Sequence, residues 1–344
     1  MKIAVDAMGG DHAPEEIVKG ALEAAQKFPC EIVLVGDQDR IKEFLDQPSE
    51  KISIKHAPDV IEMGEHPSEA VRTKKNSSIV VATELVKSGE CDAVLSAGNT
   101  GAAAAAAQLI LRRIQGIGRP AIATPIPTPR GVTLMLDSGA NVDSKPEHLV
   151  QSGMMASVYV EHVFGKNNPT VGLLNIGEED SKGNEQVKAA YELLKGMTTI
   201  NFIGNVEGRD IPTGKVDVVI CDGFVGNIVL KFAEGLANMI MGLIKEAIVD
   251  GGMTAKVGAF LLTPTLKQLG KRLDATEYGG APLLGVNGCC LISHGSSNAK
   301  AICSAIGASC DFVNSNVLGH IKAALEQNNS KKHLAVFGSF TTNV

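Results

Sequence analysis

The chain has 344 residues, of which 44% are apolar and 20% are charged, and its formal net charge is −6. These values are typical of a globular protein of one large or two fused domains, and the acidity argues against general nucleic-acid binding. Tryptophan is absent, so there is no obvious platform for base stacking. No uninterrupted run of about 18 apolar residues predicts a transmembrane helix, and a strand-like segment from residue 2 argues against a signal peptide.

The seven cysteines form an odd set without the paired spacing of a metal site. The sequence also lacks H-x-x-x-H and C-x-x-C pairs, a G-x-S-x-G nucleophile elbow and a Walker A loop. We therefore expect buried, reduced thiols in a cytoplasmic protein, with no metal and no cofactor.

Apolar runs typical of strands alternate with helix-periodic segments along most of the chain. Strands are expected at 2–6, 31–36, 51–56, 92–96, 131–137, 170–175, 200–204 and 216–221. Helices are expected at 14–27, 67–88 with a break near Asn76, 101–115, 146–164, 183–196, 224–249 and 296–327. This alternation predicts an α/β fold with a largely parallel sheet and helices on both faces, in which ligands bind beyond the carboxyl ends of the strands.

Two regions depart from this alternation. Four prolines within 118–131 predict an extended crossover, which could divide a single unit spanning 1–330 into two lobes. Residues 250–273 combine apolar and basic side chains and predict a helical hairpin. The hairpin packs on itself or on a second subunit, or it docks on a membrane or an acidic partner.

Glycine-rich loops follow many of the expected strands. The first, "DAMGGDHAP", lacks the three glycines of a dinucleotide-binding fingerprint, although an anionic or carbonyl-bearing ligand remains possible there. Its candidate binding residues are Asp6, Gly9, Gly10, Asp11 and His12.

Two further loops precede helix starts, where unpaired N–H groups favour anions. The alternative is simple N-capping by serine. The candidates in "SAGNTG" and "SHGSS" are Ser96, Gly98, Asn99, Thr100, Gly101, His294, Gly295, Ser296 and Ser297.

Three later loops carry polar side chains that point to chemistry. "DSGANVDSKPEH" contributes Asn141, Lys145 and His148, although a lone histidine is more often structural. "NIGEEDSKGNE" contributes Lys182 within what is otherwise a solvated acidic loop. "CDGFVGNIVLK" contributes Asp222, Gly223 and Asn227, and it also carries Lys231.

Taken together, the loops resemble those of the PlsX family of bacterial phosphate acyltransferases. The segments "AVDAMGGDHAP", "KKNSS", "SAGNTGA", "GANVDSKPEHL", "GNEQ", "FIGNVEGRD", "DGFVGNIVLK", "EYGGAPLLG" and "HGSS" carry the likeness from residue 1 to about 325. Val225 departs from the family pattern, in which a hydroxyl residue is common, and the tail at 331–344 has no counterpart and no assigned role.

The resemblance implies a fold akin to phosphotransacetylase and to isopropylmalate dehydrogenase. It implies transfer of an acyl group from acyl carrier protein to inorganic phosphate, feeding the first acylation step of phospholipid synthesis. It also implies a cytoplasmic homodimer that associates peripherally with the membrane, where the membrane-bound glycerol-3-phosphate acyltransferase uses its product.

The resemblance also leads to an expected mechanism. Phosphate attacks the thioester directly in a ternary complex, and no activated serine or cysteine is needed. Lys182 and the start of the "HGSS" helix neutralise the phosphate, Asn99, Asn141 and Asn227 donate amide hydrogen bonds, and His148 or Asp222 orients them. The alternatives are a nicotinamide-dependent dehydrogenase of the isopropylmalate type and a non-catalytic scaffold that recruits acyl carrier protein.

Overall fold

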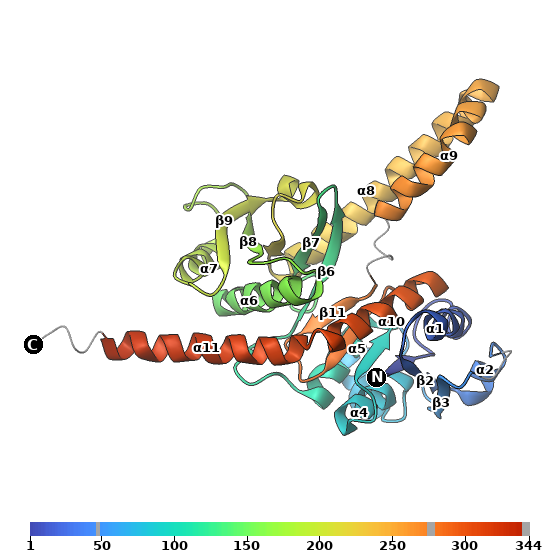
Figure 1. Cartoon of the computed structure of the whole chain (residues 1–344), viewed down its shortest axis with the longest axis horizontal. Coiled ribbons are helices and arrows are strands. Elements are labelled where there is room, and N and C mark those ends of the chain that lie inside the picture. Colours follow the sequence, from blue (N-terminus) through green and yellow to red (C-terminus); the bar gives the residue numbers. More distant parts are fainter. Residues whose placement is uncertain (46–48, 274–278, 339–344) are drawn as a thin grey trace, which may run out of the picture.

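Two β-sheets organise the computed structural model, which describes residues 1–45, 49–273 and 279–338 (Figure 1). In the described chain the first sheet has seven strands, in the order β3-β2-β1-β4-β12-β11-β5. Its strands are β1 (Lys2–Asp6), β2 (Glu31–Gly36), β3 (Ile52–His56), β4 (Ala93–Ser96), β5 (Ala121–Ile122), β11 (Ala281–Leu284) and β12 (Cys289–Ile292). The strands from β3 to β12 are parallel, and β11 runs antiparallel to both of its neighbours.

The second sheet has five described strands, in the order β6-β7-β10-β8-β9. They are β6 (Thr124–Thr128), β7 (Gly131–Leu136), β8 (Thr170–Asn175), β9 (Asn201–Glu207) and β10 (Val218–Ile220). All pairs are parallel except β6 with β7. The chain passes from the first sheet to the second at Ala123, between β5 and β6, which lies inside the proline-rich region 118–131.

Helices pack against both sheets. They are α1 (Glu15–Lys27), α2 (Gln38–Lys42), α3 (Pro67–Thr73), α4 (Ser78–Ser88), α5 (Thr100–Ala106), the π-helical turn η1 (Ala107–Leu111), α6 (Pro146–Val163), α7 (Glu185–Lys195), the 3-10 turn η2 (Gly208–Thr213), α8 (Gly223–Asp250), α9 (Gly252–Leu273), α10 (Ala299–Asn314) and α11 (Val317–Gly338). α1 packs on α10, α4 lies against β1, and α6 packs against both α7 and α11.

Alternation along the strands divides the core, because successive side chains of a strand point to opposite faces. Ile3 and Val5 of β1 belong to a cluster with α1 and α10, whereas Ala4 belongs to another cluster with α4 and α5. The first cluster continues through α6 to Leu134 and Leu136 of β7. One apolar core therefore joins the two lobes, which fixes the sheets relative to each other.

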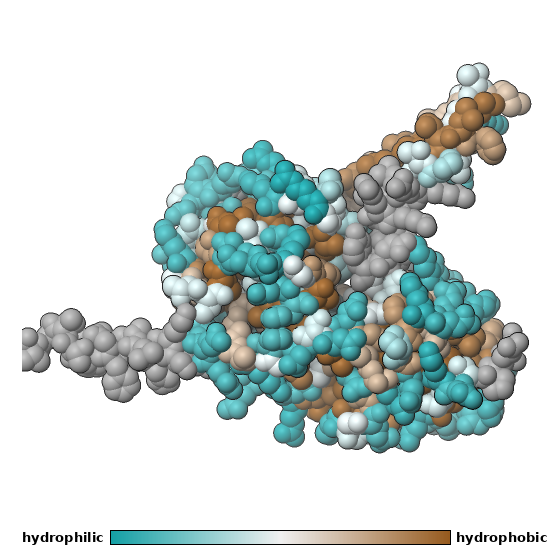
Figure 2. All heavy atoms as spheres, in the orientation of Figure 1, coloured by the Kyte–Doolittle hydropathy of each residue, from teal (hydrophilic) through white to brown (hydrophobic). Residues whose placement is uncertain are grey.

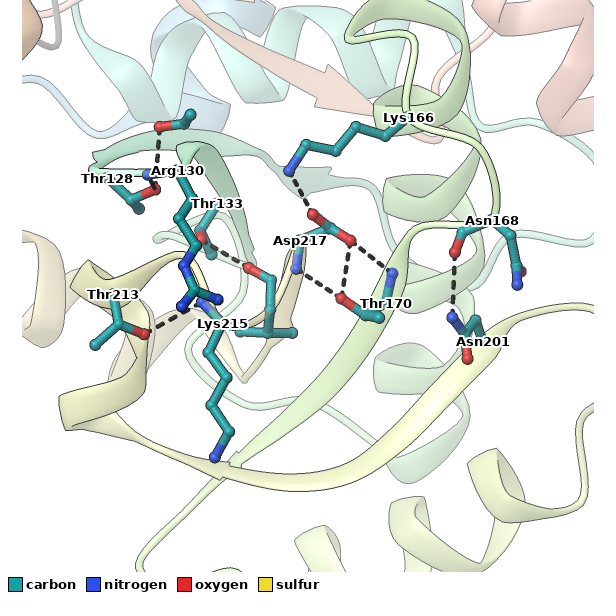
Figure 3. Close-up of polar contacts among 12 residues, drawn as sticks. Thr128, Arg130, Thr133, Lys166, Asn168, Thr170, Asn201, Thr213, Lys215 and Asp217 are labelled. Atoms are coloured by element: carbon teal, nitrogen blue, oxygen red, sulfur yellow. Dashed lines mark hydrogen bonds and ion pairs between the residues drawn. The ribbon is translucent and has the colours of Figure 1, made fainter.

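A polar network ties together the amino-terminal ends of the strands in the second sheet (Figure 3). Asp217, just before β10, forms an ion pair with Lys166 and accepts hydrogen bonds from the N–H and hydroxyl of Thr170, at 2.9 and 2.8 Å. Burial raises the pKa of Asp217, but the bonds from Lys166 and Thr170 outweigh it, so that pKa lies below its ordinary value. The network stands at the opposite end of the strands from the loops that the sequence marks as a site.

The expected α/β class is confirmed, with two corrections of detail. The largely parallel sheet is two sheets, and β5, β6, β11 and β12 are additional to the expected strands. The region 250–273, predicted to be a hairpin, is essentially the single helix α9. The hairpin is instead formed by α8 and α9, which turn at Gly251 and Gly252. The tail from 331 continues α11 as far as Gly338, and residues 339–344 lie outside the described part of the chain.

The hairpin projects from the body and exposes apolar side chains along both arms (Figures 1 and 2). Phe232 on α8 and Phe260 and Leu261 on α9 are 69%, 77% and 72% exposed. By length and composition alone, α8 is long and apolar enough to cross a membrane. Lys231 and Glu234 interrupt its apolar sequence, so α8 contains no uninterrupted apolar run of that length.

Candidate active site

The first wall of the candidate site is formed by loops at the carboxyl ends of β1, β4 and β12. The Ser96 hydroxyl donates a 2.7 Å hydrogen bond to Asp6 Oδ2, and the Gly98 N–H donates to Ser96 Oγ at 3.1 Å. The Asp11 N–H donates to the Gly295 carbonyl at 2.8 Å, which brings the "HGSS" loop to the same place. Three loops that lie far apart in the sequence are thereby joined.

Glycine is required where these loops meet. A Cβ on Gly9 would lie 2.6 Å from Asp6 Oδ2 and 2.7 Å from the backbone nitrogen of Gly98, too close for any side chain. Gly10 has φ +118°, a conformation that favours glycine, and its Cβ would lie 3.2 Å from the Gly295 carbonyl oxygen. The glycine pair that opens the sequence therefore serves loop packing and does not cradle a dinucleotide.

Asp6 holds this wall together from inside. Its side chain is almost fully buried, and burial raises the pKa of its carboxyl, while hydrogen bonds from Ser78, Ser96 and the Met8 N–H oppose that shift. A carboxyl that is buried and shared among several donors fixes loop geometry. Asp6 is therefore a positioning residue, which holds the loops of the first wall in place.

The second wall is built around Asp137, at the carboxyl end of β7. Its carboxylate accepts hydrogen bonds from the N–H groups of Ile122, Gly139, Ala140 and Asn141, between 2.8 and 3.1 Å, and from Asn141 Nδ2 at 2.8 Å. Burial raises the pKa of Asp137, and these donors oppose the shift. The tight turn at 137–141 is thus fixed, and it is tied back to β5 through Ile122.

Helix α8 begins directly against this turn. The Gly223 N–H donates to the Asn141 carbonyl at 2.8 Å, and the Asp222 carboxylate caps the helix by accepting from the Val225 N–H at 2.8 Å. A Cβ on Gly226 would lie only 1.9 Å from the Asp137 carbonyl oxygen. The first turn of α8 is therefore locked in place, and the following turns present Asn227 and Lys231.

A cleft of about 530 Å³ lies between the helix that follows the first wall, α5, and the second wall. One side comes from α3, α5 and η1, and the other from the 138–140 turn and α8. Its lining residues are Ser68, Thr100, Gly101, Ala104, Ala105, Gln108, Leu109, Arg119, Ile122, Ser138, Gly139, Ala140, Asn227 and Lys231. The charged members of this lining are Arg119 and Lys231, so the cleft has a positive electrostatic character suited to an anion.

Several predicted residues lie in or beside the cleft. Thr100, Gly101 and Asn227 line it. The remainder of the predicted set at the same sheet edges serves the two walls described above: Asp6, Gly9, Gly10, Asp11, Ser96, Gly98, Gly295, Asn141, Asp222 and Gly223.

Three predicted amide or carboxylate groups are already committed within the protein. The Asn99 side chain caps α5 through its oxygen, while its nitrogen donates to the Glu62 and Met63 carbonyls at 3.2 and 3.1 Å. The Asn141 nitrogen donates to the Pro120 carbonyl at 2.6 Å as well as to Asp137. Asp222 is the N-cap of α8. These contacts give the side chains structural work, so among the predicted amides Asn227 is the one facing the cleft.

The expected anion site at the "HGSS" helix is filled by the protein itself. Helix α10 begins at Ala299, three residues later than expected, and Asn298 caps it. The Ala299 N–H donates to the Glu16 carboxylate at 2.6 Å. Within the loop the His294 ring bonds the Ser296 hydroxyl at 2.7 Å, and the Ser297 hydroxyl bonds that of Ser293 at 3.0 Å. The start of this helix therefore leaves few hydrogen-bond donors free to bind phosphate.

Four predicted basic residues lie away from the cleft lining. Lys182 is exposed in the loop after β8, where its carbonyl accepts from Asn175 Nδ2 at 3.1 Å. His12 is exposed before α1, and Lys145 is exposed at the N-cap of α6. His148 closes the capping box by accepting the Lys145 N–H at 3.1 Å, so its Nδ1 has a structural role.

Lys231 was noted beside Asp222 and Asn227 in the sequence but was not assigned to the site, and Arg119 was not considered. Lys231 lies four residues after Asn227, one helical turn along the same face, and that spacing was a usable signal. Arg119 carries no such signal, because it reaches the cleft only through the crossover from η1 to β5.

Comparison with known proteins identifies the family of the chain. A family model described as "Fatty acid synthesis protein" matches residues 1–320. A phosphate acyltransferase of Desulfitobacterium hafniense (strain DSM 10664 / DCB-2) is 58% identical over 328 residues, covering 94% of this chain and 98% of the relative. One from Pelotomaculum thermopropionicum is 54% identical over 328 residues, with 95% of each chain covered.

Solved structures share the fold at low sequence identity. A phosphotransacetylase from Streptococcus pyogenes has a TM-score of 0.62 at 16% identity, covering 91% of this chain and 94% of that one. EutD phosphotransacetylase from Staphylococcus aureus has a TM-score of 0.57 at 15% identity, covering 94% of each chain. These structures show the fold, whereas the family model and the relatives confirm the resemblance seen in the loops: the chain belongs to the fatty acid synthesis protein family of phosphate acyltransferases.

Proposed function

We propose that the cleft between the lobes binds inorganic phosphate beside the thioester of an acyl carrier protein and transfers the acyl group to the phosphate. Family membership assigns the chain to acyl transfer to phosphate in phospholipid synthesis. The observation that supports this cleft as the site is the pair of cations, Arg119 and Lys231, set among hydroxyl and amide side chains. The dehydrogenase and scaffold alternatives are set aside, because the curated relatives carry the acyltransferase name along nearly their whole length.

The reaction depends more on positioning the phosphate beside the thioester than on activating a nucleophile. A phosphate oxygen attacks the thioester carbonyl carbon, a C–O bond forms, the C–S bond breaks, and the carrier thiolate leaves and takes up a proton. Phosphate is nucleophilic near neutral pH and a thiolate is a good leaving group, so no side-chain nucleophile is required. Arg119 and Lys231 hold the phosphate charge, with charge-assisted hydrogen bonds stronger than neutral ones. Asn227, Ser138 and Thr100 supply donors for phosphate and for the developing oxyanion.

The test measures the phosphate-dependent release of carrier thiol from the acylated acyl carrier protein, with the acyl phosphate product identified by mass spectrometry. Lys231→Met is expected to raise the KM for phosphate by about tenfold or more, since a charge-assisted contact contributes about 1.5–3 kcal/mol. Lys182→Met is the matched control, because it removes an equal charge outside the cleft. Equal effects of the two substitutions would contradict this placement of phosphate.

We further propose that the α8–α9 hairpin holds this cytoplasmic protein at the membrane surface and contributes to a homodimer. The support is the exposed apolar surface along both arms, which includes Phe232, Phe260 and Leu261. Such a position would deliver acyl phosphate to the membrane-bound glycerol-3-phosphate acyltransferase. Phe260→Ser combined with Leu261→Ser is expected to abolish sedimentation with phospholipid vesicles, and a vesicle-bound variant would contradict the proposal.

A further inference from the structure

A group of cations lies on and around the loop that leads from η1 to β5. Arg112, Arg113 and Arg119 are exposed on it, and Lys145, at the start of α6, is exposed near His148. Burial lowers the pKa of His148, and Arg119, Lys145 and Arg113 lower it further, so their fields overlap at one point. Within residues 1–45, 49–273 and 279–338, none of these four cations has a carboxylate within 4.0 Å.

The loop is mounted rigidly from both lobes. On the side of the first lobe, Asn287 Nδ2 donates to the Arg113 carbonyl at 2.8 Å. On the other side, Gln151 of α6 donates to the Gly116 carbonyl at 2.9 Å and accepts from the Gly118 N–H at 2.8 Å. A loop held in this way can present charges at fixed positions, which is what a specific contact requires.

The basic loop is continuous with the cleft. A surface hollow of about 470 Å³ along residues 108–117 shares Gln108 and Leu109 with the cleft lining. A second hollow, of about 880 Å³, lies between the loop and α11; its charged lining residues are Arg113 and Lys322, with Glu326 as the one carboxylate among them. Figure 1 shows this loop beside α11 at the junction of the lobes. A partner seated there could reach the cleft without crossing the body of the molecule.

Arg112 adopts a backbone conformation that is unusual for its type. Its φ of 64° and ψ of 169° fall in a region occupied almost only by glycine. No hydrogen bond or ion pair joins its guanidinium to the parts of the chain that the structure describes. Strain at a residue whose side chain does nothing for its own fold points to a contact with another molecule.

We propose that this surface, formed by loop 108–118 with Arg112 and Arg113 and by Lys322 of α11, docks the acidic carrier protein that delivers the acyl thioester. The inference rests on the proposed function and adds where the donor binds. The chain is acidic overall, so most of its surface repels an acidic partner. The local basic surface attracts such a partner and steers it to this place. The acyl arm would then enter the cleft past Gln108 and Leu109.

The experiment compares two acyl donors, acyl carrier protein and a small uncharged S-acyl-pantetheine. The double variant R112E/R113E is expected to raise the KM for acyl carrier protein by about tenfold or more while kcat changes little, and to leave turnover of the small donor unchanged. Added salt should raise the wild-type KM for the carrier protein much more than that of the variant. K19E/K87E, with the same change of charge on distant helices, is the control and should match the wild type.

Arg112→Gly supplies a second variant that keeps the loop. It is expected to raise Tm by removing the strain, and at the same time to raise the KM for acyl carrier protein. An unchanged KM for acyl carrier protein in both variants would overturn the docking surface. Equal losses with both donors would overturn it too, because the loop would then be part of the cleft. Loss of binding to anionic vesicles without a change in KM would assign the surface to lipid instead. If the wild type releases no thiol from either donor, the proposed function itself fails.

Discussion

Replacing Gly226 by alanine should disturb the site without touching a cleft side chain. The added Cβ would lie 1.9 Å from the Asp137 carbonyl oxygen, whereas real Cβ contacts are essentially never shorter than 3.0 Å, so α8 must retreat by at least about 1.1 Å. The clashing atom belongs to backbone in a turn fixed by the hydrogen bonds to the Asp137 carboxylate, so the turn cannot yield cheaply. Overpacking of this kind costs about 1–3 kcal/mol of folding stability.

The same displacement moves Asn227 and Lys231 relative to the opposite wall of the cleft. A misplacement of about 1 Å can lower a rate about 100-fold, equivalent to about 2.7 kcal/mol of transition-state stabilisation. We therefore expect Gly226→Ala to lower kcat/KM for thiol release by about 100-fold and to lower the urea midpoint of unfolding.

Gly235→Ala on the same helix is the matched control. Its Cβ would meet no atom within 4 Å, so the substitution should add about 0.5–1 kcal/mol of stability through helix propensity and leave kcat/KM unchanged. Wild-type kcat/KM in Gly226→Ala would refute the argument that the contact between α8 and the Asp137 turn sets the geometry of the cleft.

Three further outcomes are expected. Arg119→Gln should raise the pKa of His148 toward its ordinary value, because a nearby cation disfavours the imidazolium. NMR titration of the His148 ring measures this pKa, and an unchanged value would contradict a positive field from Arg119 at His148. Asp217→Asn should cost about 1–2 kcal/mol at neutral pH. Since the folded pKa of Asp217 is lowered, that cost should shrink as the pH falls through it, which urea unfolding at several pH values would show. Glu16→Ala should lower stability by about 1 kcal/mol through loss of the bond to the Ala299 N–H, with phosphate KM unchanged; a changed KM would restore that helix start to the site.

Local pattern was sufficient for most of the fold. The regular alternation of strands and helices predicted the α/β class and every parallel strand except β12, because burial on both faces leaves continuous apolar runs. The strands that were not predicted are short or contain proline. β6 contains proline and pairs only at a sheet edge, β5 has two residues, and β11 and β12 have four residues each.

For the site, the sequence determined which loops meet, because glycines and polar residues at strand ends mark the carboxyl edge of a parallel sheet. Tertiary structure decided which side chains remain available. Asn99 and Asn141 are consumed by hydrogen bonds to distant segments, and the start of α10 is filled by Glu16 from α1, whereas Asp222 is consumed locally as the N-cap of α8. Only the packing of one lobe against the other brings Arg119 to the cleft. The sequence gives the charge of a residue directly, but it does not show which residues of the other lobe will lie beside it.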